Sequence, residues 1–380
     1  MGGAEGVLFA LAKELACAGD EVHIVSDAAK EVAAQYPNIR FHYVGIPSWV
    51  SKASTRAGFL AWLIHHLVGN LAAFIAALRV LRKEKHPFDV VHCHGNLSAL
   101  LLTTVTRIPI VYTEHDSTPW SAPHGGLLER MIRRLAYRLL DVTVARKASR
   151  LVSLYEAQRR EFIERWSIPG ERIKLIPNGV RLLTSCGEPS HESRVRAFVS
   201  QFGNYCLFVG RLEPRKGVDI LIEALRDETI PAWIIGDGPW CGSIAARVAA
   251  LGMSERVRLG GFVEPASLAA YYESARLFVL PSRSESFPLS VLEAMSMGIP
   301  VVVSRVGAME ELVEENRCGL VVNPSDPKDL KEKILLLMGD PKLAQELGAN
   351  GREAVLSKYA WNAIAQSHRS LYRTLSGSNK

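Results

Sequence analysis

Two rounds of alternating strand-like and helix-like segments constrain the fold more than any other feature of this sequence. In the first half, apolar strand-like runs at residues 21–27, 89–95 and 108–116 alternate with helix-like stretches at 3–18 and 126–140. Runs of Val and Ile that end in polar residues are typical of parallel strands buried on both faces. The second half repeats the plan from YCLFVG to IPVVVS. We therefore predict an α/β chain with two doubly wound parallel sheets.

The length of 380 residues favours two domains, because a single core rarely extends that far. The polar, Gly- and Pro-containing stretch Arg181–Ser193 is the predicted boundary, and Tyr359–Leu375 has the pattern of an amphipathic helix. The apolar stretch Gly58–Leu78 has the length of a membrane span. Because His65 and His66 interrupt it, we expect a buried or interfacial helix there instead.

The charge of the chain is uneven. Residues 1–185 hold 23 Lys and Arg against 16 Asp and Glu, whereas residues 186–380 hold 22 against 23. This surplus indicates either a face for an anionic partner, such as membrane lipid, a phosphorylated substrate or nucleic acid, or a solvated helical face. The six cysteines form no CxxC pair and are predicted to be reduced thiols.

The loops that follow the strands of the second half are predicted to form one rim. In open parallel sheets, ligands bind beyond the carboxyl ends of the strands. Four loops with glycines and charged residues occupy such positions: GRLEPRKG (210–217), GDGPW (236–240), GGFVE (260–264) and SRSESFPLS (282–290). In the first of them, Arg211 and Lys216 are suited to a diphosphate, since Arg binds as a fork and Lys as a point charge. Two solvated surface cations are the alternative.

The stretch ESFPLSVLEAM, residues 285–295, places two glutamates around a predicted helix start. Pro288 has a preset φ that suits the start of a helix, and the amides of Leu289 and Ser290 then offer N–H groups to an anion. Glu285 and Glu293 are carboxylates that accept hydroxyl hydrogen bonds, as from a ribose or a sugar diol. The alternative is an ordinary helix-face Glu293 and a Glu285 that interacts with the helix dipole.

Taken together, the motifs resemble those of retaining glycosyltransferases with the GT-B fold, family 4, and they occur in the family's order along nearly the whole chain. Glu285 and Glu293 correspond to its E-x7-E element. The resemblance implies two Rossmann-like domains facing a cleft: an acceptor domain at 1–183, a donor domain at 184–358 and a helix at 359–380 that crosses back to the first domain. The matching stretches are GGAE, VVHCHG, YTEHD, IPNGV, GRLEPRKGVDILIEAL, IIGDGPW, LGGFV and ESFPLSVLEAMSMGIPVVVS.

The resemblance also implies roles for individual residues. Arg211 and Lys216 would hold the diphosphate, Glu293 the ribose, and Glu285 the transferred sugar. Phe262 would lie against the base, and His115 would line the sugar site. The catalytic residues implied are His115, Glu285, Arg211 and Lys216. The donor-binding residues implied are Gly2, Gly3, Arg211, Lys216, Gly236, Phe262, Glu285, Phe287, Leu289, Ser290 and Glu293.

No metal or cofactor is expected. The sequence has no DxD motif, and His92, Cys93 and His94 are consecutive strand positions that point to opposite faces. An NAD-dependent oxidoreductase is disfavoured because no GxGxxG follows a first strand with an acidic residue about twenty positions later.

The chain departs from the family pattern at its beginning. Relatives have a β-strand before GGAE, whereas Met1 stands here directly before Gly2, so we expect the N-terminal sheet to lack its first strand. We expect a chain extended upstream by about ten residues to be more stable or more active. Two further departures are Pro288, where many relatives have Gly, and Val306–Leu312, where many have a Gly-Gly pair.

The function implied is a metal-independent hexosyltransferase that uses a nucleotide-sugar, with a UDP-sugar first and GDP-mannose second. The acceptor expected is a sugar or a lipid-linked precursor in cell-envelope or exopolysaccharide synthesis. Pro119, Trp120 and His124 either line the acceptor entrance or form a structural loop. A cytoplasmic enzyme, with peripheral contact to an anionic membrane and no nucleic-acid partner, fits this reading. The alternatives are a GT-B-fold nucleotide-sugar epimerase and a non-catalytic interaction protein.

Overall fold

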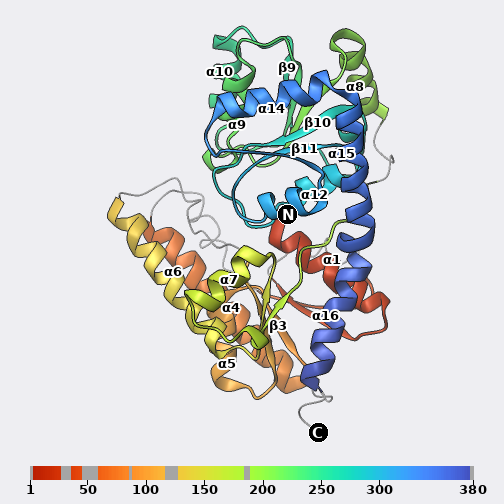
Figure 1. Cartoon of the computed structure of the whole chain (residues 1–380). Coiled ribbons are helices and arrows are strands. Elements are labelled where there is room, and N and C mark those ends of the chain that lie inside the picture. Colours follow the sequence, from red (N-terminus) through yellow and green to blue (C-terminus); the bar gives the residue numbers. More distant parts are fainter. Residues whose placement is uncertain are drawn as a thin grey trace. The chain divides into compact units, whose positions relative to one another are not determined.

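The structure of this chain is a computed structural model, which describes residues 3–26, 36–44, 59–84, 88–115, 127–183 and 189–376. The chain divides into two compact units, coloured by sequence in Figure 1. Unit 1 comprises Met1–Pro177 together with Trp361–Lys380, and unit 2 comprises Asn178–Ala360.

Unit 1 contains two separate parallel sheets in its described residues. One sheet pairs β1 with β2, and the other has the order β3-β4-β5-β6. The strands are β1 (Val22–Ser26), β2 (Ile39–Tyr43), β3 (Val91–Cys93), β4 (Ile110–Thr113), β5 (Arg150–Ser153) and β6 (Ile173–Leu175). The helices are α1 (Gly3–Cys17), α4 (Phe59–Lys83), α5 (Asn96–Val105), α6 (Leu127–Lys147), α7 (Glu156–Glu164) and α16 (Trp361–Ser376).

A largely apolar cavity lies beside the edges of these two sheets. It has a volume of about 460 Å³ and is lined by residues of α1, α4, β1 and β3. Among the described strands, β1 and β3 each have one edge without a strand partner. The described part of unit 1 therefore has two parallel sheets where the sequence predicted one sheet that lacks its first strand.

Unit 2 is built on a six-stranded parallel sheet with the order β12-β11-β10-β7-β8-β9. Its strands are β7 (Tyr205–Val209), β8 (Ala232–Ile235), β9 (Val257–Gly261), β10 (Ala275–Leu280), β11 (Val301–Ser304) and β12 (Gly319–Val322). Its helices are α8 (Pro189–Phe202), α9 (Val218–Leu225), α10 (Cys241–Ala250), α11 (Leu268–Glu273), α12 (Leu289–Ser296), α13 (Met309–Asn316), α14 (Pro327–Gly339) and α15 (Pro341–Ala354). Every residue of β8 and β11 is buried, so the prediction of parallel strands covered on both faces is confirmed.

The C-terminal helix belongs to unit 1, where α16 packs on α1 (Figure 1). Arg369 of α16 pairs with Asp20 at 2.8 Å. The division into units falls a few residues from the boundaries expected from the sequence. The Val180 amide donates to the carbonyl oxygen of Tyr359 at 2.8 Å, and this bond holds both connecting segments on unit 2.

No helix in the described part of the chain has the length and apolarity needed to cross a membrane. The cysteines within the described ranges form no disulfide with one another.

Candidate functional site

The loops after the unit 2 strands meet at one edge of the sheet, as the sequence predicted. All six strands run parallel, so the loops after β7, β8, β9 and β10 leave from the same edge. Backbone hydrogen bonds of 2.7–2.9 Å join these loops to one another: Leu212 to Asp237, Gly236 to Gly261, and Arg283 to Arg215. The result is a continuous rim of backbone and charged side chains.

Glycines allow this close approach of the loops. Gly236 has φ +137°, and a Cβ there would lie 1.8 Å from the carbonyl oxygen of Gly210. Gly307 has φ +58°, and a Cβ there would lie 2.1 Å from the carbonyl oxygen of Glu285. Any larger residue at either position has to displace backbone. Gly236 was a predicted donor-site residue, whereas the role of Gly307 was missed, although it lies in the departing stretch Val306–Leu312.

Glu285 lies at the centre of the rim and is buried. Its Oε1 atom accepts hydrogen bonds from Nζ of Lys216 at 2.5 Å and from the Ser282 hydroxyl at 2.9 Å. Arg215 approaches its other oxygen at 3.7 Å. The two predicted residues Lys216 and Glu285 are therefore joined by an ion pair that two further side chains support.

Arg211 lies at the same edge but points to solvent, with 68% of its side chain exposed. Nε of Arg211 forms an ion pair with Oε2 of Glu213 at 3.8 Å. Arg215, which the sequence analysis did not select, pairs with Glu213 at 3.1 Å and is three-quarters buried. The adjacent basic residues in EPRKG were the signal for Arg215. Three cations therefore occupy this loop, and Arg211 is the one that is most exposed.

The helix α12 presents its N-terminus at the rim. Pro288 is the residue just before the helix, with φ −75°, and it is followed by Leu289 as the first helical residue. No side chain caps this end, so the first-turn amides, including that of Ser290, are oriented outward without an intrahelical acceptor. Phe287 is buried, and its carbonyl oxygen accepts from the Asn178 side chain at 3.4 Å. Backbone amides at a helix N-terminus are the kind of group that binds an anion, so the predicted phosphate role of this end stays a prediction.

Glu293 lies one turn into α12 and accepts a hydrogen bond from the Tyr272 hydroxyl at 3.0 Å. Burial raises the pKa of the Glu293 carboxyl, and the bond from Tyr272 opposes that rise. Tyr272 was missed, because nothing in YYES distinguishes it from a core tyrosine. Phe262, after β9, is 67% exposed, so an aromatic face remains open at the rim. The four predicted elements, cations, amides, carboxylates and an aromatic ring, therefore all occur in unit 2.

His115 lies in unit 1, two residues after the end of β4, and forms part of a histidine cluster. Its Nε2 atom is 2.6 Å from Nδ1 of His94. Burial lowers the pKa of His115 to about 4, and burial together with the neighbouring histidines lowers that of His94 well below its usual value. Both rings are therefore neutral at pH 7, and one donates to the other. His92 shares the face of His94, with ring centroids 4.4 Å apart, whereas Cys93 packs in the core on the opposite side.

Some predicted residues cannot be placed in this description. Gly2, Pro119, Trp120 and His124 lie outside the described residues. Gly3 is the first residue of α1.

Comparison with known proteins agrees with this geometry. Residues 1–182 match the description "Glycosyltransferase Family 4", and residues 193–354 match "Glycosyl transferases group 1". A D-inositol 3-phosphate glycosyltransferase of Thermobispora bispora is 32% identical over 321 residues, covering 79% of this chain and 74% of the relative. One from Frankia alni is 29% identical over 98% of this chain and 94% of the relative.

Solved structures show the same fold. Sucrose-phosphate synthase from Thermosynechococcus elongatus aligns with a TM-score of 0.78 and 24% identity, covering 99% of this chain and 94% of that one. Anabaena Alr3699/HepE in complex with UDP and glucose aligns with a TM-score of 0.74 and 22% identity, covering 98% and 96%. The fold is thus GT-B, with two Rossmann-like domains. Family matches over both halves, together with a relative at 32% identity, show that this chain belongs to the family 4 glycosyltransferases.

Proposed function

We propose that this chain transfers a sugar from a UDP-sugar to an acceptor hydroxyl with retention of the anomeric configuration and without a metal ion. The observation that carries the proposal is the unit 2 rim, where Lys216 meets the buried Glu285 beside the uncapped N-terminus of α12. A diphosphate needs positive charge and N–H donors, and the rim offers both. Complexes of Anabaena Alr3699/HepE with UDP and with UDP-glucose support uridine as the first base to test.

Each part of the donor has a partner of suitable chemistry on the rim. Arg211 and Lys216 face the diphosphate, Glu293 the ribose hydroxyls, and Phe262 the base. Glu285 and the amides that follow Phe287 face the sugar. Because Glu293 already accepts from Tyr272 at 3.0 Å, its carboxylate is oriented before a ribose arrives.

The proposed reaction follows from the charges that develop. The bond between the anomeric carbon and the diphosphate oxygen breaks, and its electron pair stays on the diphosphate. Arg211, Lys216 and the amides of α12 stabilise that negative charge, and loss of one such donor typically costs about 10²–10³ in kcat. The acceptor oxygen bonds to the same face of the sugar, and its proton passes to the leaving phosphate. In unit 1, the neutral ring of His115 is suited to a hydrogen bond with a sugar hydroxyl.

The donor is tested by thermal-shift titration of the chain with UDP, GDP, ADP and NAD. We expect UDP to raise the Tm of the wild type and to have little effect on Lys216→Ala. Lys331→Ala is the matched control, because Lys331 forms a surface pair with Glu228 at 3.3 Å, away from the rim loops. A response to NAD alone, or an equal UDP response in Lys216→Ala, would contradict the proposal.

Turnover is tested with UDP-sugars and a panel of acceptors. D-inositol 3-phosphate belongs in this panel, because relatives from Frankia alni and Thermobispora bispora carry its name. The anomeric configuration of the product, read by NMR, tests retention, and full activity in EDTA tests metal independence. Isomerised nucleotide-sugar formed without an acceptor would identify an epimerase instead.

We further propose that α6 of unit 1 contacts an anionic membrane surface, where a lipid-linked acceptor would be met. Leu135 and Leu139, one turn apart on α6, are 62% and 60% exposed, and Arg138 beside them is also exposed. Apolar side chains next to a cation suit the surface of a bilayer that carries negative lipid. Co-sedimentation with vesicles containing phosphatidylglycerol is expected to be lost in Leu135→Glu and kept in the unit 2 control Leu336→Glu. Equal binding by both variants would contradict this part.

A further inference from the structure

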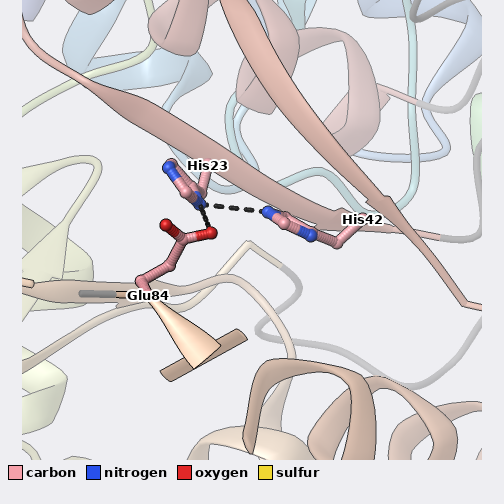
Figure 2. Close-up of side chains that lie close together, drawn as sticks. All are labelled: His23, His42 and Glu84. Atoms are coloured by element: carbon pink, nitrogen blue, oxygen red, sulfur yellow. Dashed lines mark hydrogen bonds and ion pairs between the residues drawn. The ribbon is translucent and has the colours of Figure 1, made fainter. Parts of the chain in front are cut away.

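Two histidines and a glutamate converge in unit 1, and none of them belongs to the unit 2 rim or to the histidine cluster of His115 (Figure 2). His23 lies on β1, His42 on β2, and Glu84 directly follows α4. In the sheet, Val25 pairs with His42, so His23 and His42 lie two positions apart on the same face. The three side chains therefore come from three elements and point toward one another.

The spacing of their ligand atoms fits a single small cation. Nδ1 of His23 is 3.0 Å from Nε2 of His42 and 3.9 Å from Oε1 of Glu84. All three atoms lie within 4.8 Å of one another. With metal–ligand bonds of about 2.0–2.2 Å, ligand atoms at the corners of a tetrahedron are about 3.3–3.6 Å apart. The distances of 3.0 Å and 3.9 Å lie on either side of this value.

The residues around the three side chains form the outer support that metal sites usually have. The second nitrogen of His23, Nε2, lies 3.3 Å from a carboxylate oxygen of Glu21, the partner that fixes a metal-binding tautomer. Arg40 contacts Glu21 at 3.1 Å and Oε2 of Glu84 at 3.5 Å. Arg40 therefore holds the second oxygen of Glu84, while Oε1 turns toward the histidines.

Neighbouring residues keep solvent from the His23 side of this cluster but not from the Glu84 side. The ring of Phe88 meets His23 edge-on, at 4.9 Å between centroids, and the His23 side chain is 5% exposed. Glu84 is 29% exposed, which leaves room for a water ligand from solvent. The donor set of two imidazoles and one carboxylate suits Zn²⁺ and neighbouring transition metals, whereas Mg²⁺ and Ca²⁺ prefer oxygen ligands only.

We propose that His23, His42 and Glu84 bind one divalent transition-metal cation of the Zn²⁺ class, with water as the fourth ligand. The cation would connect the two-stranded sheet β1–β2 to the end of α4. This role is structural, because the described part of that sheet has no backbone pairing with the four-stranded sheet. It is separate from the metal-independent transfer proposed for the rim, which belongs to unit 2.

The test measures Zn²⁺ and Co²⁺ binding to the full chain after treatment with EDTA. We expect one Zn²⁺ per chain by calorimetry, a rise in Tm, and visible d–d bands of low-coordinate Co²⁺. His42→Gln and Glu84→Gln are each expected to weaken binding at least tenfold, and Glu21→Gln by about 10–100-fold. His191→Gln is the matched control, since His191 bonds to Tyr271 in unit 2.

Two results would overturn the proposal. One is the absence of stoichiometric Zn²⁺ binding by the wild type, in which case the 3.0 Å contact is a hydrogen bond between neutral rings. The other is undiminished binding by both His42→Gln and Glu84→Gln, which would place the cation elsewhere. Circular dichroism of each variant separates a lost site from a lost fold, and Glu84→Gln serves if His42→Gln fails to fold.

Discussion

Replacement of Lys216 by Met removes one member of the ion pair at the centre of the rim. Lys216 Nζ lies 2.5 Å from Glu285 Oε1, and the two side chains are 14% and 5% exposed. Removing one partner of a buried pair costs about 3–5 kcal/mol, because the other charge stays buried without its partner. Here the Ser282 hydroxyl at 2.9 Å and Arg215 at 3.7 Å remain, so we expect a smaller loss, of about 2–3 kcal/mol.

For a unit of about 180 residues, that loss corresponds to a Tm lower by about 5–10 °C. The assay is scanning calorimetry, with hydrogen exchange over β10 and α12 to locate the destabilisation in unit 2. Glu285→Gln and the double variant complete a mutant cycle, for which we expect a coupling energy of about 1–3 kcal/mol. The control is Lys331→Met, whose partly exposed pair with Glu228 is worth about 1 kcal/mol or less. A Lys216→Met loss no greater than that of the control, with coupling near zero, would refute the reasoning.

Three further substitutions test other parts of the molecule. Glu293→Gln is expected to raise the Tm at pH 7 and to weaken UDP binding. Burial raises the pKa of the Glu293 carboxyl, so the charged carboxylate destabilises the fold above that pKa. The same Tm for the variant and the wild type between pH 4 and 8 would contradict this. Gly236→Ala should lower the free energy of unfolding by about 2 kcal/mol or more, because a Cβ there would lie 1.8 Å from backbone. Gly242→Ala, where a Cβ would meet open space, should not lower it. Urea unfolding measures both changes. Unit 1 should lose stability as the pH falls from about 6.5 to 4. The reason is that the pKa of His115 is lowered to about 4 in the folded chain, so the unfolded chain binds the proton more readily. In denaturant titrations, His115→Gln should make the stability of unit 1 depend less on pH over this range.

Much of unit 2 could be predicted from the sequence. Its strands are continuous apolar runs, and strands buried on both faces leave few alternatives to a parallel sheet. Once the sheet is parallel, the loops after the strands share one edge. That topological rule is sufficient to predict that Arg211, Lys216, Phe262 and Glu285 lie at one edge of the sheet.

The rest depended on distances that no local pattern encodes. The ion pair between Lys216 and Glu285 joins positions 69 residues apart, and its support by Arg215 depends on side-chain direction. The sequence pattern around Tyr272 predicts a core aromatic residue, whereas the structure shows that its hydroxyl donates a hydrogen bond to Glu293. Unit 2 begins at Asn178 and ends at Ala360, whereas the sequence predicted a boundary in the polar linker. The Val180 amide donates to the carbonyl oxygen of Tyr359, and this bond keeps both residues in unit 2.

The sequence by itself determined the fold class, the family and the edge of the unit 2 sheet where the charged loops meet, because periodicity and turn residues act locally and motifs keep their order along the chain. Only the tertiary structure decided which charges are neutralised, which are exposed and which are held by neighbours. Arg211 is open to solvent, Glu285 is buried against Lys216, and His23 meets His42 and Glu84 across three elements. The physical reason is that burial and charge pairing depend on contacts between residues distant in sequence, and those contacts exist only after the chain has packed.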